Sequence, residues 1–274
     1  MKIPRVLVPT LRPVLVLPRA RWFWRGYVNW RKPSTWRDEP AGAPETEQNP
    51  LLAFFEDRKA GRGIIKWRHY FEIYDRHFNR FRGREVNALE IGVYSGGSLE
   101  MWRDYFGPRS HIYGVDIQPK CKPYEARSIS ISIGDQADRN FWKHFKAKTP
   151  SLDIVIDDGG HHPEQQVVSF EELFPRLRPG GLYVCEDLGG TFNGFMMYAQ
   201  GLVHNLNSAE GMVGCPELRE RRQVCKTNSF QSAVASVHFY PFVVVVERAG
   251  AAVPELISSM QGSDWLSANA QVKA

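Results

Sequence analysis

Two short apolar runs in this sequence are each followed, within two residues, by a pair of acidic side chains. The runs are Ile154–Ile156 and Leu182–Val184, and the acids that follow them are Asp157, Asp158, Glu186 and Asp187. If the runs are neighbouring parallel strands, their carboxyl ends meet at one edge of a sheet, where open α/β sheets bind ligands. Carboxylates gathered there suit a hard divalent cation, because such cations prefer oxygen ligands. His161, three residues after Asp158, is placed to act as a base beside that cation.

Polar residues also follow three further predicted strands, which are Val86–Ile91, His111–Val115 and Ser128–Ile133. The glycines of the loop Glu90–Ser98 let backbone N–H groups approach a ligand closely. Asp116 lies about 20 residues beyond these glycines, a spacing suited to a ribose diol. After the third strand, Asp135 or Gln136 can meet an adenine amino group. Together these positions predict a nucleoside pocket, although the glycine spacing differs from the GxGxxG motif of dinucleotide enzymes.

These motifs resemble a known family. The loop Glu90–Ser98, Asp116, Gly134-Asp135 and the turn Pro179–Gly181 resemble class I S-adenosylmethionine-dependent methyltransferases. The more specific segments IDDGGHH (Ile156–His162) and CED (Cys185–Asp187) are similar to the macrocin and mycinamicin sugar O-methyltransferases, a metal-dependent group that also resembles cephalosporin-hydroxylase-like proteins. The resemblance covers roughly Gly61–Arg248.

The resemblance implies a role for each matched residue. It implies that Mg²⁺ is bound by Asp158, Glu186 and Asp187, and that His161 is the general base. The candidate cofactor-binding residues, which would hold S-adenosylmethionine, are Glu90, Gly92, Tyr94, Ser98, Asp116, Asp135, Gln136 and Asp157. His162 is an alternative base. Because successive strand residues point to opposite faces, Asp157 could instead support the metal ligands from behind.

The activity that the resemblance implies is Mg²⁺-dependent transfer of a methyl group to a sugar hydroxyl of a glycoside, oligosaccharide or glycosylated natural product. The region before residue 61 lacks the extra domain of the macrolide enzymes, and related enzymes methylate polysaccharide mannosides or rhamnosides. Gly160 also stands where the family often has Ser. Asp158 and Glu186 are 28 positions apart, as are the corresponding metal ligands of catechol-type O-methyltransferases. A hydroxylase-like enzyme or an O-methyltransferase acting on a catechol or other small diol remains open, because two vicinal hydroxyls can chelate one Mg²⁺. A non-catalytic, cofactor-binding protein that binds nucleic acid is a third hypothesis; the enzyme hypothesis expects no nucleic-acid partner.

The order of these elements predicts a doubly wound, mostly parallel seven-stranded sheet, a Rossmann-like class I methyltransferase fold. Two β-rich runs, Ala233–Tyr240 and Phe242–Arg248, predict a terminal hairpin whose last strand inserts antiparallel. Aromatic residues at three- and four-residue spacing predict an amphipathic helix within Gly61–Arg82. From this helix, Lys66 and Tyr70 could reach a ligand carboxylate. The segment Phe195–Leu206 predicts another helix, and Gly211–Ser229 predicts a surface insertion or substrate lid.

The composition favours one large α/β domain with extensions, since 43% of the 274 residues are hydrophobic. We expect an arm and linker over residues 1–50, a methyltransferase domain over 51–250 and a tail over 251–274. The first 37 residues hold nine Lys or Arg and no acid, and with their aromatic residues they predict an arm that packs in a homo-oligomer, with nucleic acid or an anionic membrane as alternative contacts. Four cysteines without CxxC pairing, and no run long enough to span a bilayer, predict a cytoplasmic protein.

Overall fold

The structure, a computed structural model, describes residues 49–190, 193–208 and 222–259, together with Arg25, Tyr27, Gln261 and Gly262. The chain divides into two compact units, Met1–Glu47 and Gln48–Ala274. The predicted N-terminal arm therefore lies almost entirely outside the described residues. Within the second unit, α2 (Pro50–Asp57) is the first helix of the fold.

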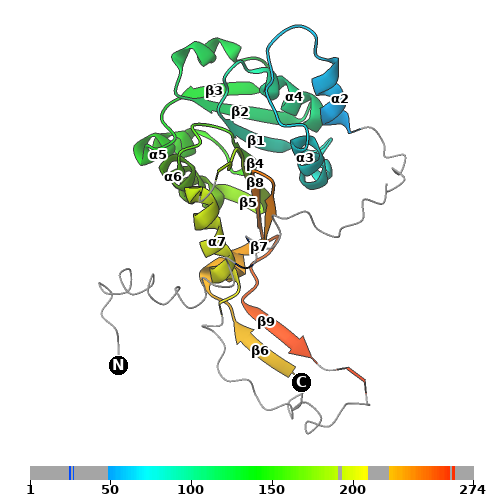
Figure 1. The fold of residues 1–274 in the computed structure, drawn as a ribbon, viewed down its shortest axis with the longest axis vertical. Coiled ribbons are helices and arrows are strands. Elements are labelled where there is room, and N and C mark those ends of the chain that lie inside the picture. The colour runs from blue at the N-terminus through cyan, green and yellow to red at the C-terminus, as the bar shows by residue number, and fades with distance from the viewer. Residues whose placement is uncertain are drawn as a thin grey trace. The chain divides into compact units, whose positions relative to one another are not determined.

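A seven-stranded sheet forms the centre of this unit (Figure 1). Its strands are β1 (Val86–Ile91), β2 (Ser110–Asp116), β3 (Ile129–Ile133), β4 (Leu152–Asp157), β5 (Leu177–Cys185), β7 (Val234–Tyr240) and β8 (Val243–Arg248). Their order is β3-β2-β1-β4-β5-β8-β7. The first five pair in parallel, whereas β8 pairs antiparallel with both β5 and β7. The predicted doubly wound sheet with an antiparallel terminal strand is thus confirmed.

Helices cover both faces of the sheet, with α2, α3 (Tyr70–Phe78) and α4 (Gly97–Phe106) on one face. The other face carries α5 (Arg139–Lys148), α6 (Pro163–Leu173) and α7 (Gly194–Leu206). Successive residues of a strand point to opposite faces, so Ala88 packs in the first core and Leu89 in the second. The shorter helices are η1 (Asn79–Phe81), η2 (Pro119–Tyr124), η3 (Phe174–Arg176) and α8 (Ser229–Ala233).

The segment before α3 differs from its prediction. The helix begins at Tyr70, and residues 58–69 form a bend, a turn and irregular backbone instead of its first turns. Gly61 adopts a positive φ of 87°, which is unfavourable for a helix. The segment then passes against the start of α4, where the backbone of Gly63 leaves no room for a Cβ on Gly97. This path carries Lys66 to the sheet edge.

A second, two-stranded sheet pairs β6 (Arg222–Lys226) with β9 (Glu255–Ser259). The sequence did not predict it, because β9 is exposed throughout and lacks the pattern of a half-buried strand. Within the predicted surface insertion or lid at 211–229, residues 222–226 form strand β6. Residues 211–221 lie outside the described residues. Among the residues that the structure describes, no helix is both long and apolar enough to cross a membrane.

The contact between α4 and the 58–69 segment gives a stability test. Gly97→Ala should lower the free energy of unfolding by about 1–3 kcal/mol, because the added methyl group overlaps backbone atoms of Arg62 and Gly63. Gly201→Ala on α7 is the matched control, since open space surrounds that position, and it should stabilise the fold by about 0.5–1 kcal/mol. Urea denaturation measures both. Equal effects would show that the α4 contact does not constrain the segment.

Candidate cofactor and metal site

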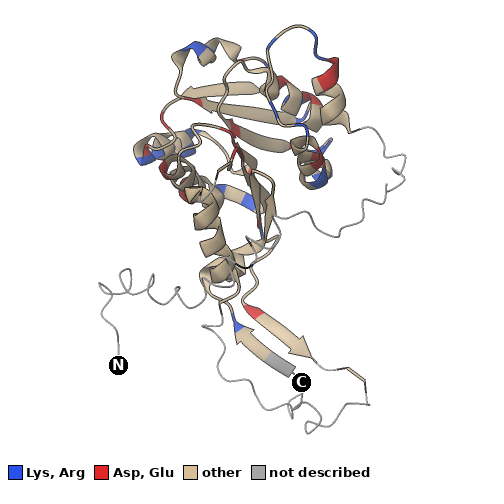
Figure 2. Ribbon diagram, viewed as in Figure 1, with Lys and Arg blue, Asp and Glu red and all other residues tan. Residues whose placement is uncertain are grey.

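The predicted acids meet at one edge of the sheet because β4 and β5 end in register. Asp157 pairs with Cys185 at the last rung of the two strands. The backbone N–H of Glu186 donates to the carbonyl of Asp157 at 2.9 Å, which ties the two acidic tips together. The N–H of Asp158 donates to the carbonyl of Ile91 on β1 at 3.0 Å. Three strand ends are therefore held side by side, and Figure 2 shows acidic positions at the ends of these central strands.

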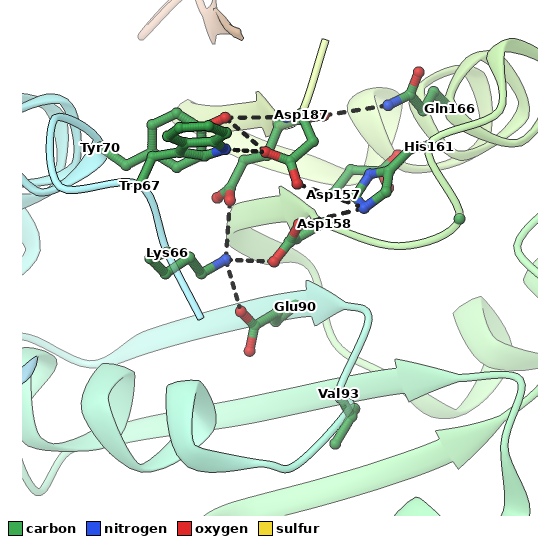
Figure 3. A network of polar contacts seen from close by, with 12 residues as sticks. Lys66, Trp67, Tyr70, Glu90, Val93, Asp157, Asp158, His161, Gln166 and Asp187 are labelled. Carbon is green, nitrogen blue, oxygen red and sulfur yellow. Dashed lines mark hydrogen bonds and ion pairs between the residues drawn. The ribbon is translucent and has the colours of Figure 1, made fainter. Parts of the chain in front are cut away.

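The Lys66 ammonium lies at the centre of three of these carboxylates (Figure 3). Its Nζ is 2.6 Å from Asp158 Oδ2, 2.9 Å from Glu186 Oε2 and 3.5 Å from Glu90 Oε1. The Lys66 side chain is only 2% exposed. Burial alone would lower the pKa of Lys66, but Glu186, Tyr74, Asp158 and Glu90 together raise it, so the ammonium stays protonated. The sequence predicted that Lys66 could reach a carboxylate of a ligand; its partners in the structure are carboxylates of the protein itself.

The Glu186 carboxylate has a partner on each oxygen. Lys66 donates to Oε2, and the buried Tyr74 hydroxyl donates to Oε1 at 2.6 Å. Burial raises the pKa of Glu186, and the Lys66 charge opposes that rise. The sequence predicted Tyr74 only as a core residue of an amphipathic helix. No local pattern distinguishes a core tyrosine from one that supports a distant carboxylate 112 positions away.

A second, more exposed group shares Asp158 with the Lys66 cluster and consists of Asp158, His161 and Asp187. His161 Nε2 lies 3.9 Å from Asp158 Oδ1 and 3.6 Å from Asp187 Oδ2. One ligand atom from each of the three lies within 4.8 Å of the others. Both His161 and Asp187 adopt a positive φ of 55°, the backbone conformation that turns these side chains toward each other.

Asp187 is held in place through its other oxygen. Oδ1 accepts hydrogen bonds from the Tyr70 hydroxyl at 2.8 Å and from the Trp67 indole N–H at 3.1 Å. Burial and the Asp187 carboxylate raise the pKa of Tyr70, which keeps the hydroxyl protonated as a donor. Among the described residues, the hydrogen bonds of Asp158 and Asp187 fall on one oxygen each, so Asp158 Oδ1 and Asp187 Oδ2 remain for a ligand. Two such oxygens beside an imidazole fit a hard divalent cation.

A cavity of about 550 Å³ adjoins this group. Predicted site residues that line it are Gly92, Tyr94, Ser98, Asp116, Asp135, Gln136, Asp158, His161 and Asp187. Glu90, Asp157 and Glu186 do not line it, because they are buried behind the strand ends. From its buried position, Glu90 contacts the cavity wall by accepting a 2.6 Å hydrogen bond from Ser98 Oγ. His162, the alternative base, does not line the cavity either and is the N-cap residue of α6.

Backbone contacts shape the cavity wall. A Cβ on Gly92, where φ is 92°, would overlap the carbonyl of Asp158, so glycine allows the β1 loop to lie against the acidic tip. Asp116 Oδ2 accepts from the N–H groups of Val93 and Tyr94 at 2.9 and 3.0 Å. Its Oδ1 accepts from the N–H of Gln118 at 2.8 Å. Asp116 thus orders the loop, with its carboxylate on the cavity wall.

Gln136 and Asp157 form a buried pair of polar groups under the 159–161 loop. Gln136 Nε2 donates to Asp157 Oδ1 and to Ser169 Oγ, each at 3.1 Å, and its Oε1 accepts from the N–H of Gly160 at 2.7 Å. The Tyr183 hydroxyl donates to Asp157 Oδ2 at 2.8 Å. Gln136 therefore uses its whole amide to hold the loop that precedes His161. Asp135 is exposed and its Oδ1 accepts from the N–H of Ala137 at 2.8 Å.

Comparison with known proteins identifies the central part of the chain. A family described as a methyltransferase domain matches residues 89–188. Demethylmacrocin O-methyltransferase of Streptomyces fradiae is 47% identical over 133 residues, which are 46% of this chain and 33% of that protein. The 8-demethyl-8-alpha-L-rhamnosyl tetracenomycin-C 2'-O-methyltransferase of Streptomyces olivaceus is 34% identical over 255 residues, which are 84% of this chain and 64% of that protein.

A solved structure is also similar. It is the MycE methyltransferase from the mycinamycin biosynthetic pathway, in complex with Mg, SAH and mycinamycin VI. The match has a TM-score of 0.58 and 31% identity, and covers 73% of this chain and 53% of MycE. The chain spans between one third and two thirds of the curated relatives named above and about half of the MycE chain. The similarity therefore concerns the domain that holds the cavity and the acids.

The buried Asp157 predicts a dependence of stability on pH. Burial raises the pKa of Asp157 from 3.8 to about 7 despite two hydrogen bonds to its carboxylate. The folded state therefore favours the protonated form, and this contribution to stability is complete below about pH 4 and is lost as the pH rises through about 7. The side chain introduced by Asp157→Asn cannot ionise. Between pH 5 and 8, the free energy of unfolding of this variant should therefore fall by about 2–4 kcal/mol less than that of the wild type. Urea denaturation of both proteins in EDTA from pH 5 to 8 measures the difference, and parallel curves would contradict the assignment.

Proposed function

Because this chain contains a methyltransferase domain related to those of sugar O-methyltransferases, we propose that it transfers a methyl group from S-adenosylmethionine to a sugar hydroxyl with the help of Mg²⁺. The observation that carries the proposal is the position of Asp158, His161 and Asp187 at the wall of the cavity. A pocket, two available carboxylate oxygens and a histidine lie within reach of one reacting group. The named relatives act on sugar-bearing compounds, which favours a glycoside over a catechol as the acceptor.

The cavity fits the methyl donor. Its wall combines the loop around Gly92 and Tyr94 with Asp116 at the end of β2, where a carboxylate can accept both ribose hydroxyls. Asp135 lies on the same wall at the end of β3, in reach of the adenine amino group. Asp116 is already ordered by three backbone N–H groups, so little side-chain entropy is lost when the nucleoside binds.

Asp158 and Asp187 would hold Mg²⁺, with Glu186 close behind them as the third acid expected from the family. When bound, the cation supplies stabilisation of the negative charge that develops on the acceptor oxygen. His161 would take the acceptor proton through Nε2, which lies next to both aspartates. The Trp67 and Tyr70 donors hold Asp187 in one orientation, and Gln136 holds the loop of His161, so the site needs little rearrangement.

The acceptor sugar would lie against Trp67 and Phe242. Their rings are 5.5 Å apart, and the Trp67 side chain is 54% exposed although its N–H is bound to Asp187. Trp67 does not line the cavity, and Figure 3 shows it beside Asp187 and away from Val93 of the β1 loop. The methyl donor in the cavity would therefore leave the Trp67 ring accessible to an acceptor beside Asp187. An exposed aromatic face suits the C–H face of a sugar ring.

For the domains and the arm, the proposal keeps the roles that the sequence predicts. Residues 51–250 would carry catalysis and 251–274 would be a tail. The basic, aromatic residues 1–50 would pack on a second subunit in a homo-oligomer. The composition of that arm supports this contact, because apolar aromatic surface at this density often marks a protein–protein contact.

Methyl transfer can be measured directly. Labelled S-adenosylmethionine should transfer label to a panel of rhamnosides, mannosides and glycosylated macrolides with Mg²⁺ but not with excess EDTA. The physical reason is that a neutral sugar hydroxyl is a weak nucleophile without a cation. His161→Ala should reduce kcat by roughly 10²–10⁴ with little change in S-adenosylmethionine affinity, and His162→Ala should do far less.

Three outcomes would contradict parts of this proposal. Full transfer in EDTA would exclude the metal role, and label on catechols but on no glycoside would change the acceptor class. A larger effect of His162→Ala than of His161→Ala would exchange the two histidines. Binding of S-adenosylmethionine without transfer to any acceptor would favour a non-catalytic protein.

The aromatic pair gives a separate prediction for acceptor binding. Trp67→Leu should raise the acceptor KM by roughly tenfold, since aromatic contacts of this kind contribute about 0.5–1.5 kcal/mol, and should leave the S-adenosylmethionine affinity unchanged. Trp67→Phe keeps the ring and should lose less. Met197→Ala is the matched control, because Met197 is also exposed but lies on α7. Equal acceptor KM values for Trp67→Leu and the wild type would place the acceptor elsewhere.

A further inference from the structure

Lys66 is bound to Asp158, which the proposed function assigns to the cation, and to Glu186, the acid close behind it. Its ammonium lies 2.6 Å from Asp158 and 2.9 Å from Glu186, and both contacts are hydrogen bonds. A buried ammonium needs such partners, because its desolvation is otherwise costly. A divalent cation at Asp158 Oδ1 would share this carboxylate with Lys66, which holds Oδ2, and two cations that share one carboxylate repel each other. Lys66 and the metal therefore make conflicting demands on Asp158 and Glu186.

The structure contains a second partner that Lys66 can use. Glu90 Oε1 is buried and lacks a hydrogen-bond partner among the described residues, and it lies 3.5 Å from Lys66 Nζ. The other oxygen of Glu90 accepts from Ser98 Oγ, which fixes the carboxylate at the start of the cofactor loop. A small movement of the ammonium toward Glu90 would complete a hydrogen bond that is now missing and would release Asp158.

The backbone on both sides of Lys66 holds its side chain among these three acids. Arg62 and Gly63 pack on Gly97 at the start of α4, and Trp67 and Tyr70 are bound to Asp187. The segment is thus attached on both sides of Lys66. The side chain is left with a choice among three acids within 3.5 Å, all of which lie on the carboxyl side of the sheet.

We propose that Lys66 is an internal counter-ion that competes with the divalent cation for Asp158 and Glu186, and that it shifts to Glu90 when the cation binds. This inference rests on the proposed metal site. In the metal-free protein, Lys66 compensates the clustered carboxylates and keeps the strand ends together. In the metal-bound protein, the charge that Asp158 and Glu186 need comes from the cation. The affinity for metal is then lower than the same acids would give without the lysine.

Lys66→Met tests the proposal through the binding of Mg²⁺ alone. Calorimetry on the full chain should give a Kd for Mg²⁺ at least tenfold lower than that of the wild type, because the competing cation is gone. The same variant should melt at a lower temperature than the wild type in EDTA, and added Mg²⁺ should raise its melting temperature by more. Lys66→Gln, which keeps an N–H donor for the acids but no charge, should show the same tighter binding and serves if Lys66→Met does not fold.

Lys146→Met is the matched control. Lys146 also forms an ion pair with a glutamate, Glu172, but on the α5–α6 surface, so its removal should leave the Kd for Mg²⁺ unchanged. Equal or weaker Mg²⁺ binding by both Lys66 variants would overturn the competition, because it would mean that the ammonium helps to arrange the metal ligands. Absence of Mg²⁺ binding in the wild type and in both Lys66 variants would overturn the metal part of the proposed function as well, whereas normal wild-type binding with no gain in the variants would overturn this inference alone.

Discussion

One buried ammonium group holds the functional edge of this protein together. Three strands of a parallel sheet bring carboxylates to the same place, and without a cation these groups would repel one another in a region that excludes water. Lys66 supplies that cation from a segment that is neither helix nor strand, and it does so with hydrogen bonds to Asp158 and Glu186. The 58–69 segment packs on Gly97 at the start of α4 and precedes the short α3, and this path brings the Lys66 side chain to the acids.

At the strand ends, the fold separates buried carboxylates from carboxylates that face the cavity. On the buried side, Glu90, Glu186 and Asp157 have strongly desolvated carboxylates that contact Lys66, Tyr74, Gln136 and Tyr183. On the open side, Asp158, His161 and Asp187 face the cavity. This division explains why adjacent acids in the sequence have different environments: residues 157 and 158, and 186 and 187, point in different directions from the ends of neighbouring strands.

The sequence predicted the sheet and the clustering of acids well, because both depend on local patterns. β1 has the predicted bounds, and the antiparallel β8, Val243–Arg248, fills the predicted β-rich run Phe242–Arg248. The sequence could not predict which acid is buried, since that depends on helix α3 and its Tyr74, far away in the chain. It extended α3 over the 61–69 segment because aromatic spacing indicates a helix even where glycine and tertiary contacts prevent one. It missed the β6–β9 pair because β9 is exposed throughout and has no burial pattern.

In the proposed function, the acids at the ends of β4 and β5 form a metal site next to the methyl-donor cavity. Anomalous diffraction from crystals grown with Mn²⁺ and S-adenosylhomocysteine tests this site directly, because Mn²⁺ prefers the same oxygen ligands as Mg²⁺ and scatters anomalously. We expect one strong peak in contact with the carboxylates of Asp158 and Asp187, with the nucleoside in the cavity beside it. An ordered nucleoside together with no peak at these acids, or with a peak at another site, would contradict a metal site here.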